Sequence, residues 1–159
     1  MKKIVSVIGQ GSSSDQQDAQ AFDLGRLLSQ AGYSIVCGGK GGVMEAVARG
    51  AAETGGLCIG LLPGHDQMEA NRFLSVAIPT GLGHARNYLV VQAGQVVVAV
   101  GGGYGTLSEI AFALTMGKTV IGINTWKATS GSGIGAEIIA VQSAREAVEK
   151  VNKILTAKH

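Results

Sequence analysis

The chain has 159 residues, of which 46% are hydrophobic and only 15% are charged. This length suits one domain with a single core, predicted here over residues 1–159, and the apolar content excludes long disordered segments. The 13 basic and 11 acidic residues leave a net charge of +2. Such a weak field argues against a dedicated duplex-binding protein, so no nucleic-acid partner is expected.

Cysteine usage and apolar runs indicate the compartment. Cys37 and Cys58 each lie inside an apolar run, without a paired-cysteine motif. Isolated cysteines of this kind favour a reduced, cytoplasmic setting. The apolar run 4–8 is too short for a signal peptide, and no stretch reaches the roughly 18 apolar residues that cross a bilayer. We therefore expect a soluble protein without a membrane partner.

Short runs rich in valine and isoleucine alternate along the chain with alanine- and leucine-rich segments of helical period. In chain order, these patterns predict strand 3–9, helix 15–31, strand 33–38, helix 42–54, strand 57–62, a polar loop at 63–72, strand 74–78, a helix at about 84–93, strand 95–100, helix 106–116, strand 119–123, a loop around 130–133, the apolar run 137–141 and helix 143–157. Ser143 and Glu146 have the spacing of a capping box at the start of the last helix.

Several of the predicted strands are apolar at every position, which indicates burial on both faces. Strands that alternate with helices through short connections form parallel sheets. The sequence therefore predicts a single Rossmann-like α/β domain, built as a doubly wound, mainly parallel sheet with helices on both faces. In such sheets, ligands bind at the carboxyl ends of the strands, where helix N-termini also gather.

Three glycine- or serine-rich turns fall at this edge, at residues 9–14, 38–42 and 101–106. A glycine-rich turn that leads into a helix offers free backbone N–H groups and the positive end of the helix dipole, and both attract phosphate. One such turn can be a tight turn and nothing more, but three on one edge favour an anion or nucleotide site. The predicted ligand-binding residues are Gly11, Ser12, Gly39, Gly41, Gly42, Gly102, Gly103, Tyr104, Gly105 and Thr106.

Motifs of several common sites are missing. Ser14 stands where the dinucleotide fingerprint has its third glycine, and no acidic residue ends the second strand, which disfavours a standard NAD dehydrogenase. A P-loop and a nucleophile elbow are absent as well. The histidines lack metal-ligand spacing, and we interpret His65, Asp66 and Glu69 as a solvated loop, so no metal is expected.

Three ionisable residues, Glu45, Arg86 and Glu109, are predicted at the same rim of the sheet. A carboxylate beside an arginine and a phosphate cradle suits N-glycosidic cleavage, which needs a carboxylate to stabilise an oxocarbenium-like centre or to activate water. Structural alternatives remain open. Thr106 and Glu109 have the spacing of a capping box, and Arg86 could form a surface ion pair.

The segments GHARN at 83–87 and GGYGTLSE at 102–109 resemble the LOG family of cytokinin-activating phosphoribohydrolases. The resemblance extends to Gly38-Gly39 and to GVM at 42–44, covers most of the domain, and is closest to the related molybdenum-cofactor-carrier-like branch. It implies Arg86 and Glu109 as a catalytic pair, residues 102–106 as the site of a 5′-phosphate, and a homodimer or higher homo-oligomer.

Two positions depart from the family pattern. Gly101 stands where the motif has proline, and Asn87 replaces the lysine that usually follows the arginine, which removes one positive charge. Lysine decarboxylation, an older label of the family, is not expected, because Lys40 and Lys118 have no pyridoxal-phosphate context.

Three functional interpretations therefore stay open. The first is hydrolysis of a nucleoside 5′-monophosphate to free base and ribose 5-phosphate, with Glu109 assisting water attack and Arg86 orienting the substrate. This reaction requires no cofactor. The second is non-catalytic carriage or sensing of a bound nucleotide or molybdenum cofactor, which is a phosphorylated, pterin-like ligand. The third is a purely structural role for the glycine-rich edge.

Overall fold

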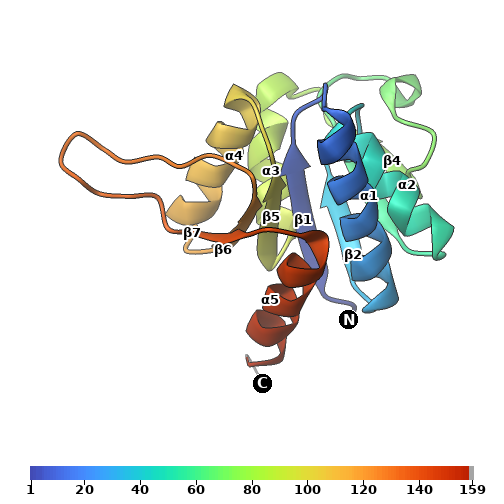
Figure 1. Ribbon diagram of the computed structural model, residues 1–159. Helices are drawn as coiled ribbons and strands as arrows, with labels where there is room; N and C mark the ends of the chain where they lie inside the picture. Colours follow the sequence, from blue (N-terminus) through green and yellow to red (C-terminus); the bar gives the residue numbers. More distant parts are fainter. Residues whose placement is uncertain (158–159) are drawn as a thin grey trace.

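Seven strands form one parallel sheet in the computed structural model, which describes residues 1–157 (Figure 1). The strands are β1 (Ile4–Gly9), β2 (Ser34–Cys37), β3 (Cys58–Leu62), β4 (Val76–Pro79), β5 (Val96–Val100), β6 (Thr119–Ile123) and β7 (Ile138–Val141). Their order across the sheet is β4-β3-β2-β1-β5-β6-β7, and each neighbouring pair is parallel. The predicted α/β fold class is thus confirmed.

Helices cover both faces of this sheet (Figure 1). The α-helices are α1 (Asp15–Gln30), α2 (Val43–Glu53), α3 (Arg86–Ala93), α4 (Tyr104–Thr115) and α5 (Ala144–Thr156), and the short 3₁₀ turns are η1 (Gln67–Glu69) and η2 (Gly83–Ala85). α1, α2 and α5 pack with one face, whereas α3 and α4 pack with the other. Successive β5 residues alternate between the two cores, Val96 and Val98 facing one and Val97 and Ala99 the other. This explains why the strands are continuously apolar.

Two serines cap helices in different ways. Ser143 accepts the N–H of Glu146, as predicted, but the Glu146 carboxylate accepts the N–H of Gln142 instead of returning to Ser143. The predicted capping box at α5 is therefore only half formed. A complete box occurs at α1, where Ser14 accepts from the N–H of Gln17 and donates its own N–H to the Gln17 side chain.

The chain changes direction across the sheet at β1. From β1 it proceeds outward through β2 and β3 to β4, and it then returns to the other side of β1 as β5. The helices that follow β1 and β5, namely α1 and α4, lie on opposite faces. The turns after these two strands must therefore separate, and this leaves a crevice at the carboxyl edge, which is where open α/β sheets bind ligands.

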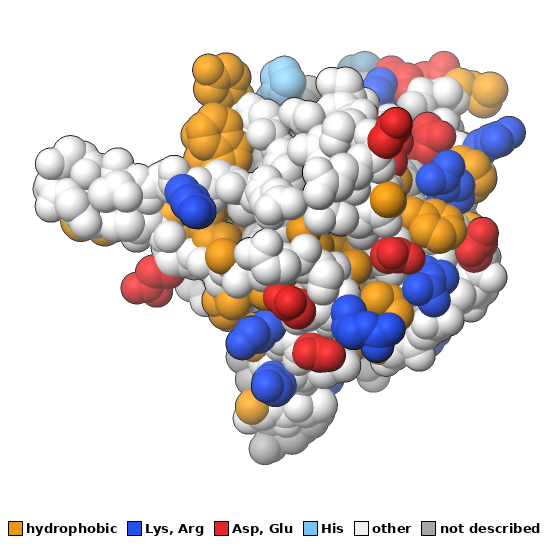
Figure 2. Space-filling view, viewed as in Figure 1, with side chains coloured by type: hydrophobic (Ala, Val, Ile, Leu, Met, Phe, Trp, Pro, Cys, Tyr) orange, Lys and Arg blue, Asp and Glu red, His pale blue; other side chains and the backbone are white. Residues whose placement is uncertain are grey.

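Residues 124–137 form a long two-armed loop between β6 and β7, which extends away from the sheet and carries a bridge between Thr129 and Gly135 (Figure 1). Figure 2 shows that acidic and basic side chains gather over α1, α2 and α5, whereas this loop is almost uncharged. Among the described residues, no helix is long and apolar enough to cross a bilayer.

Candidate functional site

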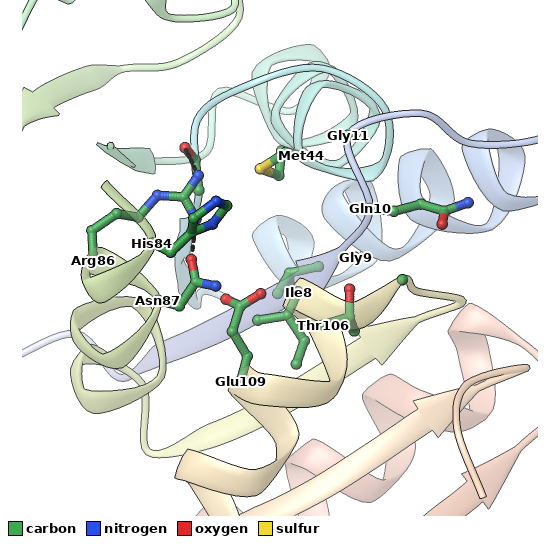
Figure 3. Close-up of a pocket in the computed structure, with 14 residues that line it drawn as sticks. Ile8, Gly9, Gln10, Gly11, Met44, His84, Arg86, Asn87, Thr106 and Glu109 are labelled. Carbon is green, nitrogen blue, oxygen red and sulfur yellow. Dashed lines mark hydrogen bonds between the residues drawn. The ribbon is translucent and has the colours of Figure 1, made fainter. Parts of the chain in front are cut away.

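The turns after β1, β2 and β5 meet around one cavity of about 230 Å³ at the carboxyl edge of the sheet, which we call the switch-point cavity (Figure 3). The first turn supplies Gly9, Gln10 and Gly11, the second supplies Gly38, and the third supplies Gly103, Gly105 and Thr106. Side chains from three helical segments complete the wall: Met44 of α2, His84, Arg86 and Asn87 around the start of α3, and Glu109 of α4. The three turns that the sequence singled out thus share one site.

Half of the predicted site residues line this cavity. They are Gly11, Arg86, Gly103, Gly105, Thr106 and Glu109, whereas Ser12, Gly39, Gly41, Gly42, Gly102 and Tyr104 do not line it. Gly42 has a positive φ, and a side chain there would collide with the backbone of Gln10 and Gly11. Its requirement for glycine therefore follows from the packing of the first turn against the second.

Arg86 begins α3 and reaches back over the end of β2. Its Nη2 donates to the carbonyl oxygen of Gly38 at 3.3 Å, and its Nη1 donates to Oδ1 of Asn87 at 2.6 Å. Its Nε is buried without a hydrogen-bond partner in the described part of the chain. Burial lowers the pKa of this guanidinium, and nearby Glu109 opposes that shift, so the group remains charged at neutral pH. The surface ion pair considered from the sequence is therefore wrong.

Glu109 points into the cavity from α4, toward Arg86 and Asn87 (Figure 3). The side chain is buried, with 6% of its surface exposed. Burial raises the pKa of its carboxyl to about 8, although Arg86 opposes the shift. At pH 7 the carboxyl is therefore mostly protonated, and the charge of the site is that of Arg86.

Thr106 does not cap α4. The helix begins two residues earlier than predicted, at Tyr104, with Gly103 as its N-cap and no side-chain cap, so the capping-box interpretation of Thr106 and Glu109 is wrong. The Thr106 hydroxyl is buried and has no partner among residues 1–157. Since buried polar groups are nearly always hydrogen-bonded, the two unpaired groups on this wall, Thr106 Oγ1 and Arg86 Nε, point to a polar ligand.

Asn87 has a structural role that the sequence did not reveal. It is buried, it accepts from Arg86, and its Nδ2 donates to Oγ of Ser108 at 3.4 Å. The Ser108 hydroxyl donates in turn to the carbonyl oxygen of Gly105 at 2.6 Å. Asn87 thus links the arginine of α3 to the first turn of α4. Gln10, Met44 and His84 also line the cavity. Each lies inside a segment that the sequence singled out, at 9–14, 42–44 and 83–87, but none was named as a site residue.

A family model describes almost the whole chain. The model of the SLOG cluster4 family matches residues 2–157. The chain belongs to the SLOG cluster4 family. An uncharacterised protein of Archaeoglobus fulgidus is 43% identical to it over 116 residues, which make up 73% of this chain and 76% of that relative.

Solved structures with this SLOG-family fold include cofactor-binding proteins. The molybdenum cofactor binding protein of Rippkaea orientalis is 31% identical, with a TM-score of 0.88 over 98% of both chains. The molybdenum cofactor carrier protein of Chlamydomonas reinhardtii is also 31% identical, with a TM-score of 0.86 over 98% of this chain and 99% of its own. The similarity to the carrier-like branch is therefore confirmed, whereas the similarity to the LOG family rests on the motif residues.

Other charged candidates lie outside the cavity of this SLOG-family chain. Glu45, predicted at the same rim, lines a separate small hollow with Arg49. Lys40 pairs with Glu69 at 3.3 Å on the surface. Lys118 donates to three backbone carbonyl oxygens at the end of α3. In the described part of the chain, no three His, Cys, Asp or Glu side chains cluster as a metal site would require.

Proposed function

We propose that this protein binds a small phosphorylated ligand in the switch-point cavity and carries it without converting it. The molybdenum cofactor, the ligand named for the two similar structures, is the chemical class that we favour. The observation that carries the proposal is the pair of buried donors on the cavity wall, Thr106 Oγ1 and Arg86 Nε, which have no partner among the described residues, and burial raises the pKa of Glu109 beside the charged Arg86. Such a cavity attracts an anion and leaves no carboxylate to repel it.

The first turn of α4 supports a phosphate at this place. The first hydrogen bond within the helix is donated by the N–H of Leu107 to Gly103, so the N–H groups of the preceding helical residues are available to an anion. The Thr106 hydroxyl and the Nε of Arg86 face the same cavity without partners among the described residues. A phosphate group at this place would accept from the Thr106 hydroxyl and would lie at the positive end of the helix dipole, with the charged Arg86 on the wall of the same cavity.

The same electrostatics disfavour hydrolysis. A protonated Glu109 neither activates water nor stabilises a positive oxocarbenium centre. A bound phosphate would raise its pKa further, since two negative charges at close range disfavour ionisation. In addition, Asn87 supplies no positive charge where the LOG motif has lysine. These three features favour carriage over turnover.

Phosphoribohydrolase activity is the second candidate, and the proton on Glu109 is the observation that favours it. A protonated carboxyl can act as a general acid toward a departing base, and Arg86 beside it can orient the phosphate. Both functions predict phosphate binding, so they are separated by turnover.

The deciding experiment measures binding and turnover together. The purified protein is incubated with a panel of nucleoside 5′-monophosphates, binding is followed by calorimetry, and free base is followed by chromatography. We expect binding without release of base, and we expect pterin fluorescence in the acid extract of protein isolated from cells that make the molybdenum cofactor. Release of base that disappears in Glu109→Gln, with binding retained, would replace carriage by hydrolysis. A protein that binds no phosphorylated ligand would refute both.

We further propose that the protein is cytoplasmic and forms a homodimer or higher homo-oligomer. Cys37 and Cys58 are free thiols only 4.0 Å apart, as a reducing compartment allows. Tyr88 and Phe112 pack edge to face on the surface of α3 and α4, and both remain more than a third exposed. An apolar pair of this kind suits a subunit interface. Light scattering that gives a monomer mass at all concentrations would refute the assembly.

A further inference from the structure

The glycine-rich turn after β5 accepts hydrogen bonds from side chains that follow β6. Thr125 Oγ1 donates to the carbonyl oxygen of Gly101 at 2.6 Å, and Trp126 Nε1 donates to that of Gly103 at 3.0 Å. Asn124, just before them, has a φ of 48°, a left-handed conformation that asparagine tolerates better than most residues. The chain therefore turns sharply at the end of β6 and places Trp126 against the turn that begins α4.

Trp126 supports a second aromatic ring, that of Tyr104. The two rings are stacked, with centroids 6.0 Å apart and planes inclined by 29°. Tyr104 is nevertheless 84% exposed, so most of its ring surface faces solvent. The chain has one Trp and three Tyr, and two of these four residues stand together at the N-terminus of α4. An aromatic surface left open to water beside a polar cavity is typical of a ligand-binding surface.

The size of the switch-point cavity gives an independent reason for a second subsite. At about 230 Å³, it is smaller than the roughly 300–1,000 Å³ of typical small-molecule sites. It suits a phosphate and the group next to it, so the rest of a nucleotide-sized ligand must lie outside. A second cavity, of about 400 Å³, is lined by Trp126, by other residues of the loop between β6 and β7, and by residues of these two strands.

We propose that Tyr104 and Trp126 form a stacking platform for a planar heteroaromatic ring, and that this ring belongs to the ligand whose phosphate lies at the N-terminus of α4. The assignment rests on the proposed phosphate site. Tyr104 is the first residue of that helix, so phosphate and ring are separated by no more than the length of one small molecule. The ligand class is thus a monophosphate ester with a fused flat ring, such as a pterin, a flavin or a purine, and simple sugar phosphates bind more weakly.

The test compares ligands with and without a ring on the full-length protein. Calorimetric affinities are measured for flavin mononucleotide, guanosine 5′-monophosphate and ribose 5-phosphate, and the fluorescence of Trp126 reports stacking because it is the single tryptophan. Stacking on one aromatic side chain changes affinity by about tenfold. We therefore expect at least one ring-bearing ligand to bind about tenfold more tightly than ribose 5-phosphate and to quench Trp126.

Variants assign this preference to the platform. Tyr104→Ala should reduce the preference for the ring to within about twofold, whereas Tyr104→Phe should keep it, because the ring and not the hydroxyl makes the contact. Ribose 5-phosphate should bind both variants as it binds the native protein. Ile134→Ala is the control, since Ile134 is an exposed apolar side chain of the loop between β6 and β7 that does not line the switch-point cavity.

The outcomes separate this inference from the proposed function. If ribose 5-phosphate binds but rings add nothing, or if Tyr104→Ala keeps the full preference, the platform is wrong and the phosphate site stands. A preference that is lost in His84→Ala instead would place the ring on the opposite wall and would likewise overturn the platform. If none of the phosphorylated ligands binds, the proposed function fails, and the platform fails with it.

Discussion

Two partly buried cations, Lys118 and Arg86, illustrate how the two ends of this sheet differ. At the amino end, Lys118 Nζ donates to the carbonyl oxygens of Val91, Gln92 and Gly94, each at 2.6 Å. At the carboxyl end, Arg86 donates hydrogen bonds from Nη1 and Nη2 to oxygen atoms of Asn87 and Gly38, and its Nε has no partner among the described residues. Burial lowers the pKa of both groups. Lys118 thus uses all its donors to stabilise the helix end, whereas Arg86 keeps donors, Nε among them, for a ligand.

The largest expected effect concerns Glu109, the buried acid of the carboxyl end. Its pKa is raised from 4.5 to about 8 in the folded protein, so folding stability is lost as the pH rises between these two values, because only the unfolded form releases the proton. Glu109→Gln removes this penalty and should raise the free energy of unfolding at pH 7 by on the order of 3 kcal/mol.

Urea unfolding of native protein and Glu109→Gln at pH 4, 7 and 8 checks this prediction. The difference in stability should be small at pH 4 and grow toward pH 8. Glu149→Gln, on the exposed side of α5, is the control and should show no such trend. A gain that is equal at all three pH values would contradict a buried, protonated Glu109.

Arg86→Ala is expected to abolish most of the affinity of the switch-point cavity. It removes both the charge and the unpaired Nε donor, and the loss of a buried charged partner weakens binding by about 100-fold. Calorimetry with ribose 5-phosphate measures the loss. Arg72→Ala, an arginine packed on the ring of Phe73 away from the cavity, should bind normally. If Arg86→Ala binds within a few fold of the native protein, the anion lies elsewhere.

Lys118→Met should have the opposite profile, with a loss of stability and no loss of binding. Methionine keeps the apolar stem but leaves three carbonyl oxygens at the end of α3 without their charged donor, which should lower the free energy of unfolding by about 2 kcal/mol. Urea unfolding and ribose 5-phosphate calorimetry on the same sample give both values. Weakened binding of ribose 5-phosphate by a stably folded Lys118→Met variant would contradict the assignment of Lys118 to the fold and of Arg86 to the ligand.

The sequence predicts the site where local patterns decide, and fails where distant segments meet. Continuous valine and isoleucine runs give the strands, and glycine turns at their ends give the carboxyl edge, so Arg86 and Glu109 could be placed on one rim. The start of α4 was predicted too late, because the spacing of Thr106 and Glu109 imitates a capping box while Gly103 already caps the helix.

Contacts over long sequence separations left no such signal. The bond from Trp126 to Gly103 depends on β6 lying next to β5 in the sheet, and on the sharp turn at Asn124. The capping of α3 by Lys118 depends likewise on how the start of β6 meets the end of that helix. Neither pairing has a periodicity or a motif, since each follows from the order of the strands.

The smallest effect is expected from Thr106→Val. This variant tests most directly whether unpaired groups at the carboxyl end of the sheet serve a ligand, whereas Lys118 at the amino end serves the fold. Valine has nearly the shape of threonine, so the substitution removes a buried hydroxyl that has no partner among the described residues and leaves packing intact. At a structural position such a change weakens the protein, but here folding stability should stay equal or rise by up to about 1 kcal/mol, because an unpaired buried hydroxyl destabilises the fold. The affinity for ribose 5-phosphate should fall about tenfold, the value of one hydrogen bond from a hydroxyl to a charged phosphate. Thr115→Val, which removes a hydroxyl already bonded to Ala111, is the control and should leave the affinity unchanged. A Thr106→Val protein that loses stability and keeps its affinity would show that the hydroxyl serves the fold, as Lys118 does, and not a ligand.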